Sequence, residues 1–142
     1  MTRTSSSLFV LCALVGCADT DSLNAEQDDD GGPQIVTTTD SKLLRVEAYT
    51  SPDQPPTRGV SNVTLLITDA KTGEPQKGLV LEAVPWMPAH AHGTSMKTEV
   101  DAWEPGVYEI SKVNMYMGGL WDLRVALTGT KTDHVTLHFE IR

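Results

Sequence analysis

The chain has 142 residues, which is enough for one domain with one hydrophobic core. Eleven basic and nineteen acidic residues give a formal net charge of −8. Because a negative surface repels phosphates, this charge excludes nucleic acid as an expected partner. The eight prolines and eleven glycines indicate many turns and argue against a long helical bundle.

The N-terminus has the features of an export signal. Arg3 precedes a short apolar run at residues 8–15, which is too short to span a bilayer as a helix. The run ends in Leu14-Val15-Gly16-Cys17, which resembles the lipobox of bacterial lipoproteins. The resemblance implies cleavage of residues 1–16 as a signal peptide and attachment of acyl chains such as palmitate to Cys17. The alternative is an ordinary secretory signal with an incidental cysteine.

A lipidated Cys17 would decide both the location and the thiol chemistry of the protein. Cys12 would leave with the signal peptide, so no free thiol would remain for a nucleophile, a disulfide or a thiolate metal ligand. The acyl chains would make the membrane a partner without a spanning segment. Ala18 follows the cysteine where an aspartate would signal inner-membrane retention, so the pattern favours the outer membrane, with the protein facing the periplasm.

Residues 17–40 are predicted to form the lipidated cysteine and an acidic flexible linker. Small, acidic and turn-forming residues dominate this segment and bury too little apolar area to offset the entropy of ordering. The run Asp28-Asp29-Asp30 could bind Ca²⁺ weakly, but it lacks the spaced ligands and closing glutamate of a calcium loop. Residues 41–142 are predicted to form the folded domain.

Apolar and polar residues alternate with a period of two through most of the domain. The alternating runs lie at residues 44–49, 63–68, 79–84, 107–113, 121–128 and 134–141, and a shorter strand is expected near residues 95–101. Turn residues separate the runs: prolines at 52–56, a reversal at 69–75, and Glu104-Pro105-Gly106, which fits a type II turn. This pattern predicts an all-β, immunoglobulin-like antiparallel β-sandwich of about seven strands.

Two predicted loops contain every methionine other than Met1. Met87 and Met96 lie in the first loop with His90 and His92, and the second loop carries Met115 and Met117. Imidazole and thioether together suit copper, above all Cu(I), whereas Zn²⁺ gains little from methionine. The alternative is that these methionines fill gaps against Trp86 and Trp121 at one end of the sandwich.

The spacing within the loops allows a metal site. In extended backbone, His90 and His92 would leave one face about 6–7 Å apart. Met115 and Met117 repeat this spacing, and Met87 is biased to extended backbone because it precedes Pro88. The predicted ligands are therefore His90, His92, Met87, Met115 and Met117, with Met96 as a further candidate. His134 and His138 are predicted to be solvated on the polar face of the last strand.

The stretch from Pro85 to Val125 resembles the YtkA-like domain, which has FixH-like and CopC-like relatives. The matching segments are residues 87–93, MPAHAHG; residues 104–108, EPGVY; and residues 117–125, MGGLWDLRV. The resemblance extends to the reversal at 69–79 and so covers most of residues 42–141. It implies an exported immunoglobulin-like sandwich and a link to copper handling or respiratory-oxidase maturation.

No catalytic constellation is evident, and we expect a protein that is not an enzyme. A triad of Ser95, His92 and Asp101 has no nucleophile elbow around the serine. No glycine-rich phosphate loop is present. Two functions are therefore favoured: a membrane-tethered copper-binding module, and a metal-free interaction domain that docks an envelope protein through exposed Trp86-Met87 and 115–117 loops. A third reading, a general carrier for a small envelope ligand, has no pocket signature in the sequence.

Overall fold

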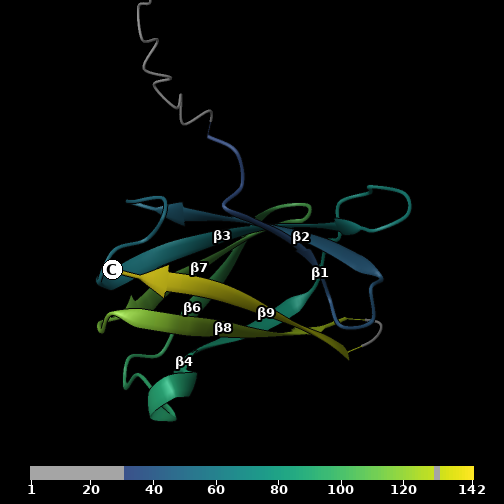
Figure 1. The fold of residues 1–142 in the computed structure, drawn as a ribbon. Coiled ribbons are helices and arrows are strands. Elements are labelled where there is room, and N and C mark those ends of the chain that lie inside the picture. The colour runs from purple at the N-terminus through teal and green to yellow at the C-terminus, as the bar shows by residue number, and fades with distance from the viewer. Residues whose placement is uncertain (1–30, 130–131) are drawn as a thin grey trace, which may run out of the picture.

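The computed structural model describes residues 31–129 and 132–142, so the predictions for the signal peptide, Cys17 and the linker up to residue 30 lie outside the described residues. The elements are almost all strands, with one short 3₁₀ turn, η1 (Figure 1). Their bounds are β1 Ile35–Thr38, β2 Leu44–Ser51, β3 Gly59–Asp69, β4 Val80–Met87, η1 Pro88–His90, β5 His92–Gly93, β6 Glu99–Glu104, β7 Val107–Met115, β8 Gly119–Thr128 and β9 Thr132–Ile141.

The strands form two antiparallel sheets that pack face to face. The first sheet has the order β1-β2-β3-β7-β6, and the second has the order β5-β4-β8-β9. Without the short strands β1 and β5, these orders are those of the seven strands of a constant-type immunoglobulin domain. The prediction of an all-β, immunoglobulin-like sandwich is therefore confirmed, with nine strands among the described residues instead of about seven.

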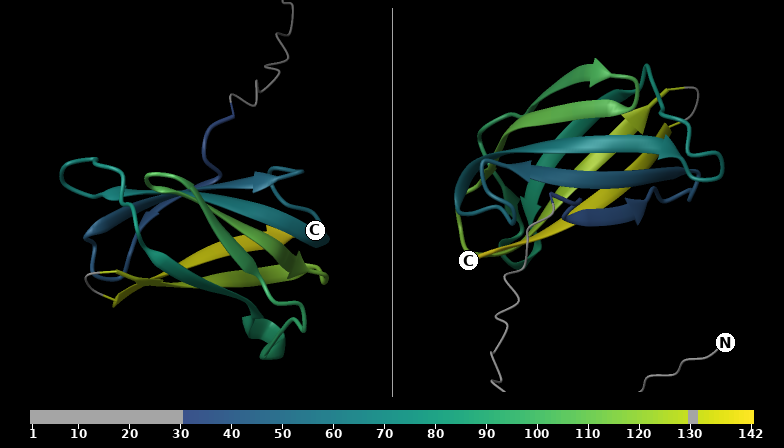
Figure 2. Two further views of the ribbon diagram at one scale, coloured as in Figure 1. Left: turned by 180° about the vertical axis from the view of Figure 1, so that it is seen from behind. Right: turned by 90° about the horizontal axis from the view of Figure 1, so that it is seen from above.

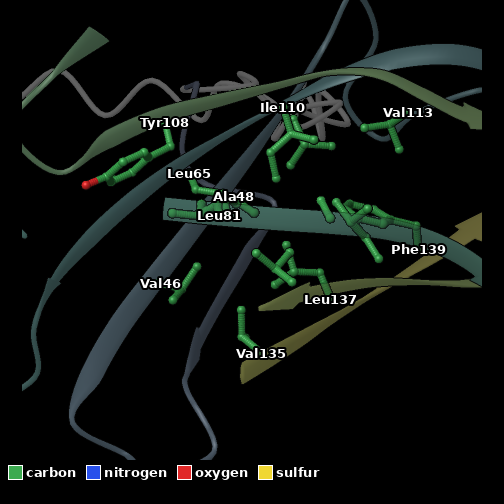
Figure 3. Packing of buried hydrophobic residues seen from close by; sticks show 14 of the residues in the cluster. Val46, Ala48, Leu65, Leu81, Tyr108, Ile110, Val113, Val135, Leu137 and Phe139 are labelled. Carbon is green, nitrogen blue, oxygen red and sulfur yellow. The ribbon is translucent and has the colours of Figure 1, made fainter. Parts of the chain in front are cut away.

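The core lies between the sheets and follows from the period of two. On β3 and β8 the inward residues are buried while most of their neighbours on the strand stay accessible to solvent. Figure 3 shows Leu65, Ile110 and Leu137 converging on the space between the two layers. The largest buried side chains are Trp121, Tyr108 and Phe139. The hydroxyl of Tyr108 donates to the Gln76 carbonyl at 2.8 Å, so its burial leaves no unpaired polar group.

The N-terminal boundary of the domain differs from the sequence prediction. Residues 35–38 were expected within the flexible linker, but they form β1 and pair with residues 45–48 of β2. The prediction of linker up to residue 40 is therefore wrong for this segment. Ile35 is half-buried against the core, and this single anchoring side chain, together with the backbone ladder, is enough to hold a four-residue edge strand.

The connections carry the predicted turn chemistry. Gly106, with a φ of 81°, follows Pro105 in the tight turn between β6 and β7, as a type II turn requires. The reversal after β3 brings Pro75 back beside Thr68 before the chain crosses to the second sheet. The shorter predicted strand is β6, displaced from residues 95–101 to Glu99–Glu104.

The described chain enters the domain on the side opposite to η1. Figures 1 and 2 show the start of the coloured chain beside the first sheet, whereas η1 lies beyond the second sheet. None of the helical residues within 31–129 and 132–142 forms a segment that is long and apolar enough to cross a membrane.

Candidate functional site

A tight hairpin joins β4 to β5 at the end of the second sheet. Met87 ends β4 in extended backbone, as predicted from the proline that follows it. Residues 88–90 make one 3₁₀ turn, Ala91 takes a left-handed conformation with a φ of 53°, and the chain returns with His92 directly opposite Met87. Since Ala91 is not glycine, this backbone is held by the surrounding hairpin at some cost in strain.

The two loop histidines lie close together, although not by the predicted route. Extended backbone was expected at both, but His90 belongs to η1 and only His92 is in a strand, so that expectation is wrong for His90. The turn nevertheless brings the ring centroids of His90 and His92 to 5.8 Å. His90 is exposed and His92 is half-buried.

His92 is held in one orientation. Its Nδ1 atom lies 2.9 Å from the Gly93 carbonyl oxygen, which can only accept, so the bond places the proton on Nδ1. The Nε2 atom is then the nitrogen with a free lone pair. This is the way in which an outer-shell bond prepares a histidine for metal ligation.

Two aromatic rings pack against His92. The Tyr116 ring stacks on His92 with centroids 6.0 Å apart, and Trp121 meets His92 edge-on at 6.2 Å. Tyr116 and Trp121 also contact each other at 5.6 Å. We call His90, His92, Tyr116 and Trp121 the histidine–aromatic cluster. Trp121 is fully buried, so the cluster runs from solvent at His90 into the core.

The methionines predicted as ligands have different surroundings. Met87 is buried at 2 % exposure opposite His92, and its Cε atom lies against Gly119. Met115 is fully buried at the end of β7, opposite Gly59. Met117 is half-buried, and its carbonyl accepts a 2.9 Å hydrogen bond from Trp121 Nε1. Of these three methionines, only Met87 belongs to the β4–β5 hairpin that carries the two histidines.

Met96 faces a groove to which no residue of the histidine–aromatic cluster contributes. It is exposed and lines this groove of about 590 Å³ between β4 and β6, together with Val84, Pro85 and Val100. Within the described residues, no group of three or more histidine, cysteine, aspartate or glutamate side chains could hold a metal ion. Besides its two imidazoles, the β4–β5 hairpin carries one thioether, that of Met87, and imidazole with thioether is a donor set that suits Cu(I).

A second polar group lies on the outer face of the second sheet. Trp86, Asp122 and His138 stand side by side on β4, β8 and β9. His138 Nδ1 lies 2.8 Å from Asp122 Oδ1, and Arg124 covers the Trp86 ring at 5.0 Å. The prediction that His138 is solvated is therefore incomplete. The register carries this information, because the pairing of Thr128 with Thr132 places residue 122 opposite residue 138.

By its architecture, this protein is a small immunoglobulin-like β-sandwich that carries a histidine-bearing hairpin at one end of its second sheet. The family model described as YtkA-like matches residues 39–126, which is more than half of the chain. The chain therefore belongs to the YtkA-like family, as its sequence motifs indicated. Neither the curated proteins nor the solved structures contain a significant match.

Proposed function

We propose that this protein is a non-enzymatic Cu(I)-binding module, tethered to the cell envelope through Cys17. The observation that carries the proposal is the 5.8 Å separation of the His90 and His92 rings, with Met87 directly opposite His92. The chemistry of this donor set, two imidazoles and one thioether, fits Cu(I) better than Zn²⁺ or a hard cation.

The donors differ in how firmly they are held, which suits a site that passes its metal on. Met87 is fixed in the core, and His92 is fixed by Gly93 and by the stacked Tyr116 ring. His90 is exposed and belongs to a short turn, so it is the donor that a metal reaches first. Copper handling or oxidase maturation, the role that the family resemblance implies, would use such an accessible site.

Competition titration tests this proposal. The purified chain is titrated with Cu(I) against a chromogenic chelator at neutral pH, and one tight site is expected. His90→Ala combined with His92→Ala should abolish that site. Unchanged Cu(I) affinity in this double variant would remove the hairpin from the proposal.

Conservative methionine variants identify the sulfur ligand. Met87→Leu and Met115→Leu both keep the buried volume and remove one sulfur atom. We expect Cu(I) affinity to fall at least tenfold in Met87→Leu, roughly the loss of one ligand, and to be unchanged in Met115→Leu and in Met96→Leu. Equal losses in Met87→Leu and Met115→Leu would contradict a ligand set centred on the hairpin.

The lipid anchor is tested separately from the metal. We expect the wild-type chain to fractionate with outer membranes and to incorporate labelled palmitate, and Cys17→Ser to do neither. A soluble, unlabelled wild-type protein would contradict the anchor and leave the copper proposal untouched. The two parts of the proposal can therefore fail independently.

The alternative function, docking of an envelope protein by an apolar tip, has less structural support. It relied on exposed Met87 and Met115, but both are buried. Trp86 is half-buried beneath Arg124. The exposed apolar side chains at this end of the second sheet are Tyr116, a member of the cluster, and Leu120, which are 47 % and 48 % exposed.

A further inference from the structure

The two sheets end in four edges, and three of these are protected against pairing. The first sheet ends on β1, which is only four residues long, and on β6, which has an irregular register at Trp103 and exposed carboxylates at Glu99, Asp101 and Glu104. In the second sheet β5 covers one end of β4. The rest of the β4 edge contains Pro85, which has no N–H, and the Thr98 hydroxyl caps the Ala83 carbonyl at 2.6 Å. These are standard means of blocking edge-to-edge association.

The fourth edge, β9, is capped at its two ends, where the Asp40 N–H donates to the His134 carbonyl and the Arg58 Nε donates to the Arg142 carbonyl at 3.1 Å. It runs for ten residues from Thr132 to Ile141 and pairs with β8 along its whole length without a register shift. Between these two ends the strand contains no proline and no lysine, and Glu140 is its one acidic residue. Long, regular edge strands of this kind are templates for pairing with another strand.

One hydrogen bond shows which backbone groups of β9 face outward. The Asp40 N–H donates to the His134 carbonyl at 2.8 Å, so the backbone of His134 points away from β8. Because N–H and C=O groups alternate in direction along a strand, Thr136, His138 and Glu140 also direct theirs outward. Among the described residues, no hydrogen bond reaches the backbone groups of these three residues.

We propose that β9 pairs antiparallel with β9 of a second copy of this chain, joining two four-stranded sheets into one. The outward groups must face each other, so residues of even number pair with residues of even number. Centring the two-fold axis on His138 places Thr136 opposite Glu140 of the second copy, and Glu140 opposite its Thr136. About six backbone hydrogen bonds then form.

Two features favour a second copy over an unlike strand. The hydroxyl of each Thr136 faces the carboxylate of the other Glu140, so the edge is self-complementary under the two-fold axis. Asp40 occupies the edge at His134, which limits pairing to the stretch beyond it and selects this register. Each His138 is held by its own Asp122 and would lie at the centre of the joined sheet.

Hydrogen exchange on the wild-type chain tests the interface directly. The amides of Thr136, His138 and Glu140 should exchange more slowly as protein concentration rises over roughly a hundredfold range, together with a rise in sedimentation mass toward a dimer. The amides of Val135, Leu137 and Phe139 already bond to β8 and should be protected at every concentration. Monomeric behaviour throughout the range, or concentration-dependent protection confined to another edge, would overturn the proposal.

A matched pair of variants separates backbone pairing from other contacts. Thr136→Pro removes an outward N–H without removing a bond to β8, and it should weaken dimerisation at least about tenfold. Thr136→Ser keeps both the N–H and the hydroxyl and should dimerise like the wild type. The near-ultraviolet circular dichroism of buried Trp121 checks that both variants are folded. Equal dimerisation of the two folded variants would exclude the β9 edge.

Discussion

His138 Nδ1 lies 2.8 Å from Asp122 Oδ1 across two neighbouring strands, and this contact closes the solvent side of a nearly buried carboxylate. The Asp122 side chain is only 12 % exposed, whereas His138 remains largely exposed. The carboxylate also faces a second basic side chain, since Arg124 Nη2 lies 3.8 Å from Asp122 Oδ2. The histidine is therefore the nearer partner of a carboxylate that has few others.

Removing this histidine should destabilise the domain. His138→Ala leaves Asp122 without its closest hydrogen bond, and we expect the free energy of unfolding to fall by about 1 kcal/mol in urea denaturation. His134→Ala is the matched control, since His134 lies on the same strand and face. It should change stability by less than about 0.5 kcal/mol. Equal effects of the two variants would contradict a specific role for the Asp122 contact.

Gly106 should not tolerate a side chain. Its φ is 81°, and a Cβ atom there would lie 2.8 Å from both the Ile67 carbonyl oxygen and Pro75 Cβ. Strained backbone and steric overlap both oppose Gly106→Ala, so we expect a loss of about 2 kcal/mol or more in the free energy of unfolding. Cu(I) affinity of the folded fraction should not change, because the turn lies in the first sheet.

Gly119→Ala should affect both stability and metal binding. A Cβ atom at this position would lie 2.8 Å from Met87 Cε, and the φ of 123° is unfavourable for alanine. Met87 must therefore shift, and the distance between its sulfur and His92 must change with it. We expect lower Cu(I) affinity in chelator competition in addition to a loss of stability. Wild-type affinity in Gly119→Ala would argue against Met87 as a ligand.

Asp133 should make stability depend on acid pH. Partial burial raises the pKa of this carboxyl, but hydrogen bonds from Ser41, Thr39 and the His134 amide outweigh burial and lower the pKa from 3.8 to about 2. The stabilisation is therefore complete above about pH 4 and is lost as pH falls through 2. Since the site is partly exposed, we expect Asp133→Asn to cost about 1 kcal/mol at pH 7 and to flatten the stability profile between pH 4 and 2.

The sandwich could be predicted because burial on one face of each strand imposes a period of two. Leu65, Trp121 and Leu137 lie inside as that period requires. The short strands could not be found in this way. β5 has two residues and β1 has four, and both are held by backbone pairing with a neighbour rather than by an alternating apolar face of their own.

The candidate site could be predicted in composition but not in geometry. The sequence grouped His90, His92 and Met87, and the fold unites them. It could not show that residues 88–90 form a 3₁₀ turn, since Ala91 supplies a left-handed conformation that sequence patterns associate with glycine. Nor could it show that Met115 is buried at the end of β7 while Met96 is exposed, because membership of a loop does not decide how deeply a side chain is buried.

The position at which the chain enters the domain has a practical consequence. The start of the coloured chain lies beside the first sheet, and η1 lies beyond the second sheet, with the thickness of the sandwich between them (Figures 1 and 2). In a protein attached to a sensor surface through its N-terminal segment, the sandwich would therefore separate the point of entry into the domain from the hairpin that carries His90. The proposed exchange of Cu(I) with a soluble donor could then be followed in real time without labelling or altering the hairpin.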